Sequence, residues 1–175
     1  FFLSLEPFFV VTVGAYFARL LRTSPRLNIP MLNKFILALV CMALAYGILT
    51  ISTFFPMLTG QVHPYNIVLY YLFITLGHLF LYPIGMAAVL KLSPKNMQGF
   101  MMGAWFFTLG LGGSLGGLFG NLAKINKDQL SSLTTERLIY QHAFLSYTLI
   151  ALAGVILILI LKPFARYYLG NTMEL

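Results

Sequence analysis

Five apolar stretches, each about as long as a membrane is thick, constrain the fold of this 175-residue chain more than any other feature. A helix needs about 20 predominantly apolar residues to cross the hydrocarbon core of a bilayer. Lipid offers the backbone no hydrogen bonds, so a spanning segment of this length satisfies its own polar groups as a helix. The sequence therefore predicts an all-α membrane protein with spanning helices at residues 1–21, 35–55, 66–90, 99–121 and 140–162.

The composition agrees with this prediction and argues against a soluble domain. Hydrophobic residues make up 59% of the chain and charged residues 9%, whereas soluble domains carry about 25% charged residues. The apolar stretches are too many to be one signal peptide. Because Phe1 already lies inside an apolar run, we expect the chain to be part of a longer polypeptide. No second domain is visible, so residues 1–175 are expected to form one helical bundle.

Prolines mark most of the predicted helix ends, where a helix is expected to stop or restart. These are Pro25, Pro30, Pro56, Pro64 and Pro94. Pro7 and Pro83 differ because they lie within predicted spans. A proline there frees a backbone carbonyl and bends the helix, which is tolerated beside a cavity or a packed neighbour. We expect Pro7, and Pro83 together with Gly85, to be bending points.

The net charge of +7 is distributed unevenly between the loops. One side of the predicted bundle carries Arg19, Arg22, Arg26, Lys34, Lys91, Lys95, Lys162 and Arg166. The other side carries Lys124, Lys127 and Arg137, offset by Asp128 and Glu136. The positive-inside rule places the first set and the C-terminus in the cytoplasm, and a polar external loop at 122–139, long enough for a short surface helix. The chain contains no aromatic-rich basic module, so nucleic-acid binding is not expected.

Glu6 and His78 are ionisable residues inside stretches otherwise suited to hydrocarbon. A carboxylate at mid-depth in a bilayer costs roughly 2.5 kcal/mol or more, so such groups usually face a cavity or a partner. Both are therefore candidates for a site that handles a charged solute or a proton. The alternatives are a neutral His78 imidazole bonded to a neighbouring helix and a Glu6 carboxylate that reaches the external interface.

Metal binding and enzymatic catalysis find no support in the sequence. His63, His78 and His142 lack a second ligand at i+3 or i+4, and Cys41 is the only cysteine. The serines of the predicted spans have no nearby base, and serines in spanning helices usually bond their own backbone. We expect no catalytic residues and no metal site.

The fourth apolar stretch is rich in glycine and holds the single tryptophan. Gly99 and Gly103, Gly112, Gly116 and Gly120, and Gly113 and Gly117 recur every four residues. Such faces favour close helix packing over contact with a ligand. Trp105 is equally compatible with an interfacial anchor and with the wall of a pocket.

A resemblance to a known family is carried by residues 75–107, which read TLGHLFLYPIGMAAVLKLSPKNMQGFMMGAWFF. They are similar to the proton-dependent oligopeptide transporters of the major facilitator superfamily. The residues in step with the family pattern are Pro83, Gly85, Lys91, Leu92, Pro94, Gly99, Gly103, Trp105 and Phe106. Upstream, SLEPFF resembles the SLNP segment of the family, and PMLNKF resembles the loop before its ninth helix. The resemblance implies that the five helices correspond to the eighth to twelfth of a twelve-helix transporter.

The chain departs from the family pattern at positions that matter for binding. The family usually has glutamate in place of His78 and asparagine in place of Glu6, and these two positions help to hold the amino terminus of a peptide. The resemblance therefore implies that the carboxylate has moved to the facing helix, with an imidazole in its former place. Tyr82 replaces a serine of the family, and Gly113 replaces a frequent asparagine. The shape of the pocket therefore differs from that of the family, and the resemblance does not decide whether the solute is a peptide. We predict that Glu6 and His78 face one another across a shared cavity.

The resemblance implies part of a proton-coupled symporter for di- and tripeptides or related small solutes, in the plasma or inner membrane. Glu6, His78, Tyr82 and Trp105 would contact solute, and Glu6 and His78 would couple its binding to protons. No cofactor is expected besides protons as the coupling ion. Alternating access needs both halves of a transporter, so the chain should not transport without an N-terminal helical bundle. The alternatives are a major facilitator transporter for a different small solute and a non-transporting structural or assembly module of the membrane.

Overall fold

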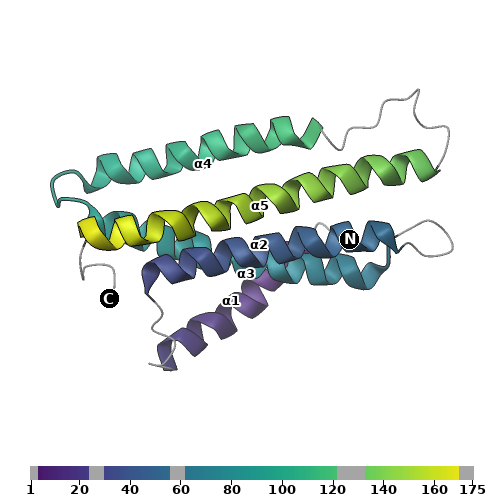
Figure 1. The fold of residues 1–175 in the computed structure, drawn as a ribbon. Coiled ribbons are helices and arrows are strands. Elements are labelled where there is room, and N and C mark those ends of the chain that lie inside the picture. Colours follow the sequence, from purple (N-terminus) through teal and green to yellow (C-terminus); the bar gives the residue numbers. More distant parts are fainter. Residues whose placement is uncertain (1–3, 24–29, 56–61, 122–132, 170–175) are drawn as a thin grey trace.

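A computed structural model describes residues 4–23, 30–55, 62–121 and 133–169. Five helices account for the regular structure in these ranges (Figure 1). They are α1 (Leu5–Thr23), α2 (Met31–Phe54), α3 (Pro64–Leu92), α4 (Gln98–Gly120) and α5 (Leu133–Leu169). The described part of the chain contains no strand, and the prediction of an all-α bundle is confirmed.

The helix bounds follow the predicted ones closely except in α5. That helix begins at Leu133 and ends at Leu169, so it extends beyond the predicted span at both ends. Residues 133–139, predicted as loop, are therefore helical, and residues 122–132 lie outside the described residues. The polar first turns with Glu136 and Arg137 continue the helix past its apolar stretch, and Pro163 lies inside the helix instead of ending it.

Four of the helices are long and apolar enough to cross a membrane by length and composition: α2, α3, α4 and the part of α5 from Glu136 to Phe164. In α1 the apolar part is shorter and covers Leu5–Tyr16. This pattern agrees with an integral membrane protein. Several charged residues used for the orientation, among them Arg26, Lys124 and Asp128, lie outside the described residues, and the orientation stays a prediction.

The centre of the bundle is α2, which packs against α3 on one side and α5 on the other (Figure 1). Small side chains fill these contacts, notably Ala38, Cys41, Ala43 and Ala45 of α2 and Ala143 of α5. Small residues let helix backbones approach closely, which is how spanning helices gain packing energy. At Gly77 of α3 the backbones of α2 and α3 lie close together, because an added Cβ would lie 2.9 Å from Cγ of Met42 and 3.1 Å from the carbonyl oxygen of Ala38.

Hydroxyl groups add polar contacts to the apolar interface between α2 and α5. The hydroxyl oxygens of Thr50 and Thr148 lie 3.2 Å apart. Each hydroxyl also reaches a carbonyl oxygen one turn back on its own helix, Thr50 that of Tyr46 and Thr148 that of Phe144. A polar contact between two threonine hydroxyls thus joins α2 and α5, and each hydroxyl also has a carbonyl partner on its own helix.

At the edge of the bundle, α4 contacts α3 and leaves its second half exposed (Figure 1). Among the described residues, an added Cβ would meet nothing within 4 Å at any of the glycines of this helix. The close packing predicted for these glycines is therefore absent from the described structure. The physical reason is that α4 touches α3 near their shared turn, and residues 110–121 are exposed except for the short contacts described below.

Candidate functional site

Glu6 and His78 meet where α1 packs against α3. Nδ1 of His78 lies 2.8 Å from Oε1 of Glu6. An ionised carboxylate can only accept hydrogen bonds, so in that state Nδ1 carries a proton and donates it to Oε1. The side chains are 27% exposed for His78 and 38% exposed for Glu6. The pair is thus half-buried and accessible, which the chemistry of an exchangeable proton or a bound solute requires.

The position of Glu6 follows from the start of α1. Glu6 lies in the first turn of this helix, where the positive end of the helix dipole favours a carboxylate. Pro7 lies in the same turn, where the missing N–H costs no helical hydrogen bond. No described helical turn precedes Leu5, so bending at Pro7 stays a prediction.

His78 belongs to a stripe along one face of α3. Tyr82 and Gly85 follow His78 at spacings of four and seven residues, which place all three on the same side of a helix. The ring centroids of His78 and Tyr82 are 5.2 Å apart, with the planes tilted by 46°. Pro83 lies inside the continuous helix α3, between Tyr82 and Gly85.

Trp105 of α4 covers the far end of this stripe. An added Cβ on Gly85 would lie 2.4 Å from Cζ2 of the Trp105 ring, so only glycine fits beneath it. Trp105 also lines a cavity of about 330 Å³ between α3, α4 and Phe35 of α2. Its Nε1 atom is buried and has no hydrogen-bond partner among the described residues. A buried donor without a partner costs about 1–3 kcal/mol, so a group that accepts from Nε1 would be stabilising.

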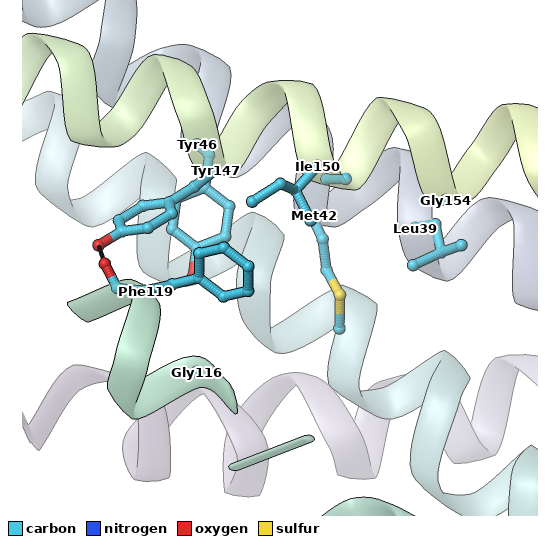
Figure 2. A pocket seen from close by; sticks show the side chains of 9 residues that line it. Leu39, Met42, Tyr46, Gly116, Phe119, Tyr147, Ile150 and Gly154 are labelled. Atoms are coloured by element: carbon cyan, nitrogen blue, oxygen red, sulfur yellow. Dashed lines mark hydrogen bonds between the residues drawn. The ribbon is translucent and has the colours of Figure 1, made fainter. Parts of the chain in front are cut away.

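A second cavity, of about 590 Å³, lies between α2, α4 and α5 (Figure 2). Tyr46 and Tyr147 line one end of it, with ring centroids 5.4 Å apart. The hydroxyl of Tyr147 donates to the carbonyl oxygen of Phe119 at 2.8 Å, which ties α5 to the end of α4 (Figure 2). The remaining lining is almost entirely apolar: Leu39, Met42, Gly116, Ile150, Ala151 and Gly154.

Sequence reasoning missed this cluster of tyrosines. Tyr46 also contacts the ring of Tyr70, at 5.6 Å between centroids, and Tyr70 contacts the ring of Tyr71, at 5.1 Å. The cluster therefore extends from the large cavity to α3. The tyrosines lie within apolar stretches that are predicted to span the membrane, where a tyrosine alone does not indicate a site. The Tyr70–Tyr71 pair stands out in the sequence, but two adjacent tyrosines do not predict a cluster.

Metal or nucleophilic chemistry gains no support from the described residues. No group of three histidine, cysteine or acidic side chains within them could hold a metal ion. His63 and His142 are exposed and lie on different helices or their ends. The hydroxyls of Ser52, Ser114 and Ser146 donate to carbonyl oxygens one turn back, at 2.6, 3.1 and 2.8 Å. Of the residues proposed from the sequence, the structure brings Glu6, His78 and Tyr82 together and sets Trp105 on Gly85.

Comparison with known proteins gives a consistent result. A sequence model described as the POT family matches residues 1–135. Dipeptide and tripeptide permease B of Salmonella typhimurium is 32% identical over 166 residues, which is 93% of this chain and 33% of the relative. The peptide transporter YePEPT of Yersinia enterocolitica is 33% identical over 143 residues, 81% of this chain and 26% of the relative. The chain thus spans about a third or less of the length of these relatives.

Solved structures show the same similarity in three dimensions. The crystal structure of tetrameric PepTSo2 superposes with a TM-score of 0.75 at 25% identity, over 95% of this chain and 32% of that one. A structure described as giving insights into substrate recognition in proton dependent oligopeptide transporters superposes with a TM-score of 0.76 at 25% identity, over 95% of this chain and 34% of that one. The arrangement of the five helices therefore matches part of a larger transporter fold.

Proposed function

Because the chain belongs to the POT family, we propose that it is the C-terminal portion of a proton-coupled symporter for di- and tripeptides or related small solutes. The relatives named above as peptide permeases and transporters support a peptide as the solute. Transport by alternating access needs two helical bundles that move about a central site. The portion described here would act together with an N-terminal bundle and would not transport without it.

The contact between His78 and Glu6 is the observation that carries the proposal. A carboxylate that is half-exposed and held by an imidazole can bind the ammonium group of a peptide and can also respond to protonation of its partner. Protons are the proposed coupling ion, and no cofactor or catalytic residue takes part. A purely structural ion pair would predict no effect of Glu6 on solute uptake.

The other proposed contacts extend along the stripe on α3. Tyr82 would contact the solute beside the pair, since the residue is 41% exposed and its ring lies against His78. Trp105 would wall the pocket, since it lines the cavity of about 330 Å³ beside Gly85. Pro83 and Gly85 would let α3 bend when the site opens and closes, because proline breaks the helical hydrogen-bond ladder.

We also propose an orientation in the membrane. The C-terminus and the loops after α1 and α3 would face the cytoplasm of a plasma or inner membrane, as the distribution of lysine and arginine predicts. The lipid bilayer would surround the exposed apolar surfaces of α4 and α5, whose large side chains include Phe107, Leu118 and Ile160.

The departures at Glu6, His78 and Tyr82 favour a second candidate, a related small solute that carries an amine but is not a peptide. These three residues form the contact region of the proposed site, and each differs from the pattern that the resemblance gave. Competition separates the two candidates. If the transporter carries peptides, di- and tripeptides should inhibit uptake of its solute. If it carries an amine that is not a peptide, they should have no effect on that uptake.

Uptake measurements on the whole transporter in proteoliposomes test the proposal. Glu6→Gln should raise the KM for alanyl-alanine at least about tenfold, because a hydrogen bond to a charged group contributes about 1.5–3 kcal/mol. Glu136→Gln is the matched control, since Glu136 also lies in the first turn of a helix, whereas His78 pairs with Glu6. Unchanged uptake by Glu6→Gln, or an equal loss in both variants, would contradict the role of Glu6.

A further inference from the structure

We propose that an apolar groove between α2, α4 and α5 holds a further membrane-spanning helix, which the whole transporter supplies from the part of its polypeptide before residue 1. This inference rests on the proposed function, because it takes the chain to be the C-terminal portion of a longer transporter. The length of the relatives leaves room for such a segment, since this chain covers 33% and 26% of theirs. The groove indicates where the segment packs.

The groove consists of two cavities that follow one another along α2 and α5. The first is the cavity of about 590 Å³ beside Tyr46 and Tyr147 (Figure 2). The second cavity, of about 280 Å³, is lined by the start of α2, the end of α3 and the later part of α5. Its lining residues are all apolar and include Phe35, Ala88 and Ile158.

One face of α2 and one face of α5 line both cavities. The lining residues of α2 follow one another at spacings of four, three and four residues: Phe35, Leu39, Met42 and Tyr46. Those of α5 have the same spacing: Tyr147, Ala151, Gly154, Ile158 and Leu161. Residues three and four apart share one face of a helix. The two cavities therefore form a continuous groove along the bundle.

The length of the groove favours a helix over a lipid chain as its occupant. From Met31 to Tyr46 the lining of α2 extends about 22 Å, at a rise of 1.5 Å per residue. One leaflet of a bilayer has a hydrocarbon depth of about 15 Å, so a lipid chain would fill only part of this length. A spanning helix crosses both leaflets and fills all of it.

The walls of the groove suit close packing between helices. Gly116 of α4 and Gly154 of α5 both line it. Small residues let a neighbouring backbone approach closely, and such packing is what holds helices together in lipid. A segment of the same polypeptide has an effective concentration of about millimolar when its linker is short, which favours it over a second copy of the chain.

Photo-crosslinking in the whole transporter tests the inference. The variants Ile150→benzoylphenylalanine and Ile156→benzoylphenylalanine form a matched pair, because both side chains are apolar and exposed on α5. Ile150 lines the groove, whereas Ile156 follows Gly154 by two residues and points to the opposite side of the helix. Mass spectrometry of the monomer band should identify a peptide from before residue 1 on the Ile150 variant and none on the Ile156 variant.

Other captured partners would overturn the inference. These are lipid alone on the Ile150 variant, a second copy of the chain in a crosslinked dimer, a different protein, or the same preceding peptide on both variants. Neither variant is tested with a solute. A transporter that captures the preceding segment but takes up no peptide would therefore contradict the proposed function and leave this inference standing.

The melting temperature of the whole transporter gives a second test. Gly116→Leu should lower it, because the new side chain would enter space that the packed helix fills. Gly110→Leu is the control, since Gly110 does not line the groove and an added Cβ meets nothing within 4 Å at either glycine among the described residues. Fluid lipid would adapt to a leucine at both positions, so an unchanged melting temperature in Gly116→Leu would contradict a packed helix.

Discussion

The indole ring of Trp105 lies against the backbone of Gly85, where a Cβ would come within 2.4 Å of Cζ2 and 2.5 Å of Cη2 of the ring. This contact is where α4 meets α3 close to the proposed site, because Gly85 lies on the same face of α3 as His78. The size of residue 85 therefore decides how near α4 can come to the pair of Glu6 and His78.

Gly85→Ala should lower the free energy of unfolding by about 1–3 kcal/mol, because the added methyl group forces the ring or the helix to move. Thermal or denaturant unfolding of the detergent-solubilised whole protein measures this loss. Trp105→Ala removes the clash, so the double variant should be more stable than the sum of the two single losses predicts. If the losses of stability in the two single variants simply add in the double variant, the ring of Trp105 is not what excludes a side chain at residue 85.

Gly77→Ala should also destabilise the protein, by about 1–3 kcal/mol, because the new methyl would meet Cγ of Met42 and the carbonyl oxygen of Ala38. Gly47→Ala is the matched control. It lies on α2 with only Cγ2 of Thr148 at 4.0 Å, so the better helix propensity of alanine should leave stability unchanged or slightly higher. The melting temperatures of the two variants check this, and equal melting temperatures would argue against the close approach of α2 and α3.

Thr50→Val and Thr148→Val test the polar contact between α2 and α5. Each hydroxyl keeps a carbonyl partner on its own helix, so the loss of the contact itself should be small. We expect a coupling energy of about 0.6 kcal/mol from a double-mutant cycle, the average for such contacts in spanning helices. A coupling energy close to zero in the folded variants would show that the 3.2 Å separation contributes nothing to stability.

The length and apolar composition of the stretches were enough to predict the helices, because a spanning segment must be apolar over a fixed length and must form its hydrogen bonds internally. The same rule missed the true length of α5, whose polar turns near Glu136 and Arg137 lie beyond the apolar stretch but still continue the helix. The thickness of the bilayer predicts which part of a helix must be apolar. It does not predict where a helix ends once it extends beyond the bilayer.

The pairing of helices was harder to predict than their existence. Glu6 and His78 are separated by 72 residues, and no local pattern links them. Their meeting was predicted from the resemblance to a family and from the cost of leaving two ionisable groups in lipid. The contact of Trp105 with Gly85 had no such signal, since it depends on how α4 turns back at residues 93–97. The glycines of α4 meet no neighbour within 4 Å among the described residues, since a small-residue face permits close packing but does not require it.

Solute recognition in this proposal depends on one carboxylate placed between α1 and α3, whichever of the two helices carries it. The most direct measurement is alanyl-alanine uptake by the whole transporter with Glu6→Asn alone and with Glu6→Asn combined with His78→Glu. We predict that the single variant loses uptake at least tenfold, because a charged hydrogen-bond acceptor is lost, and that the double variant recovers most of it. Wild-type uptake in the single variant, or no recovery in a double variant with an unchanged melting temperature, would contradict the proposal.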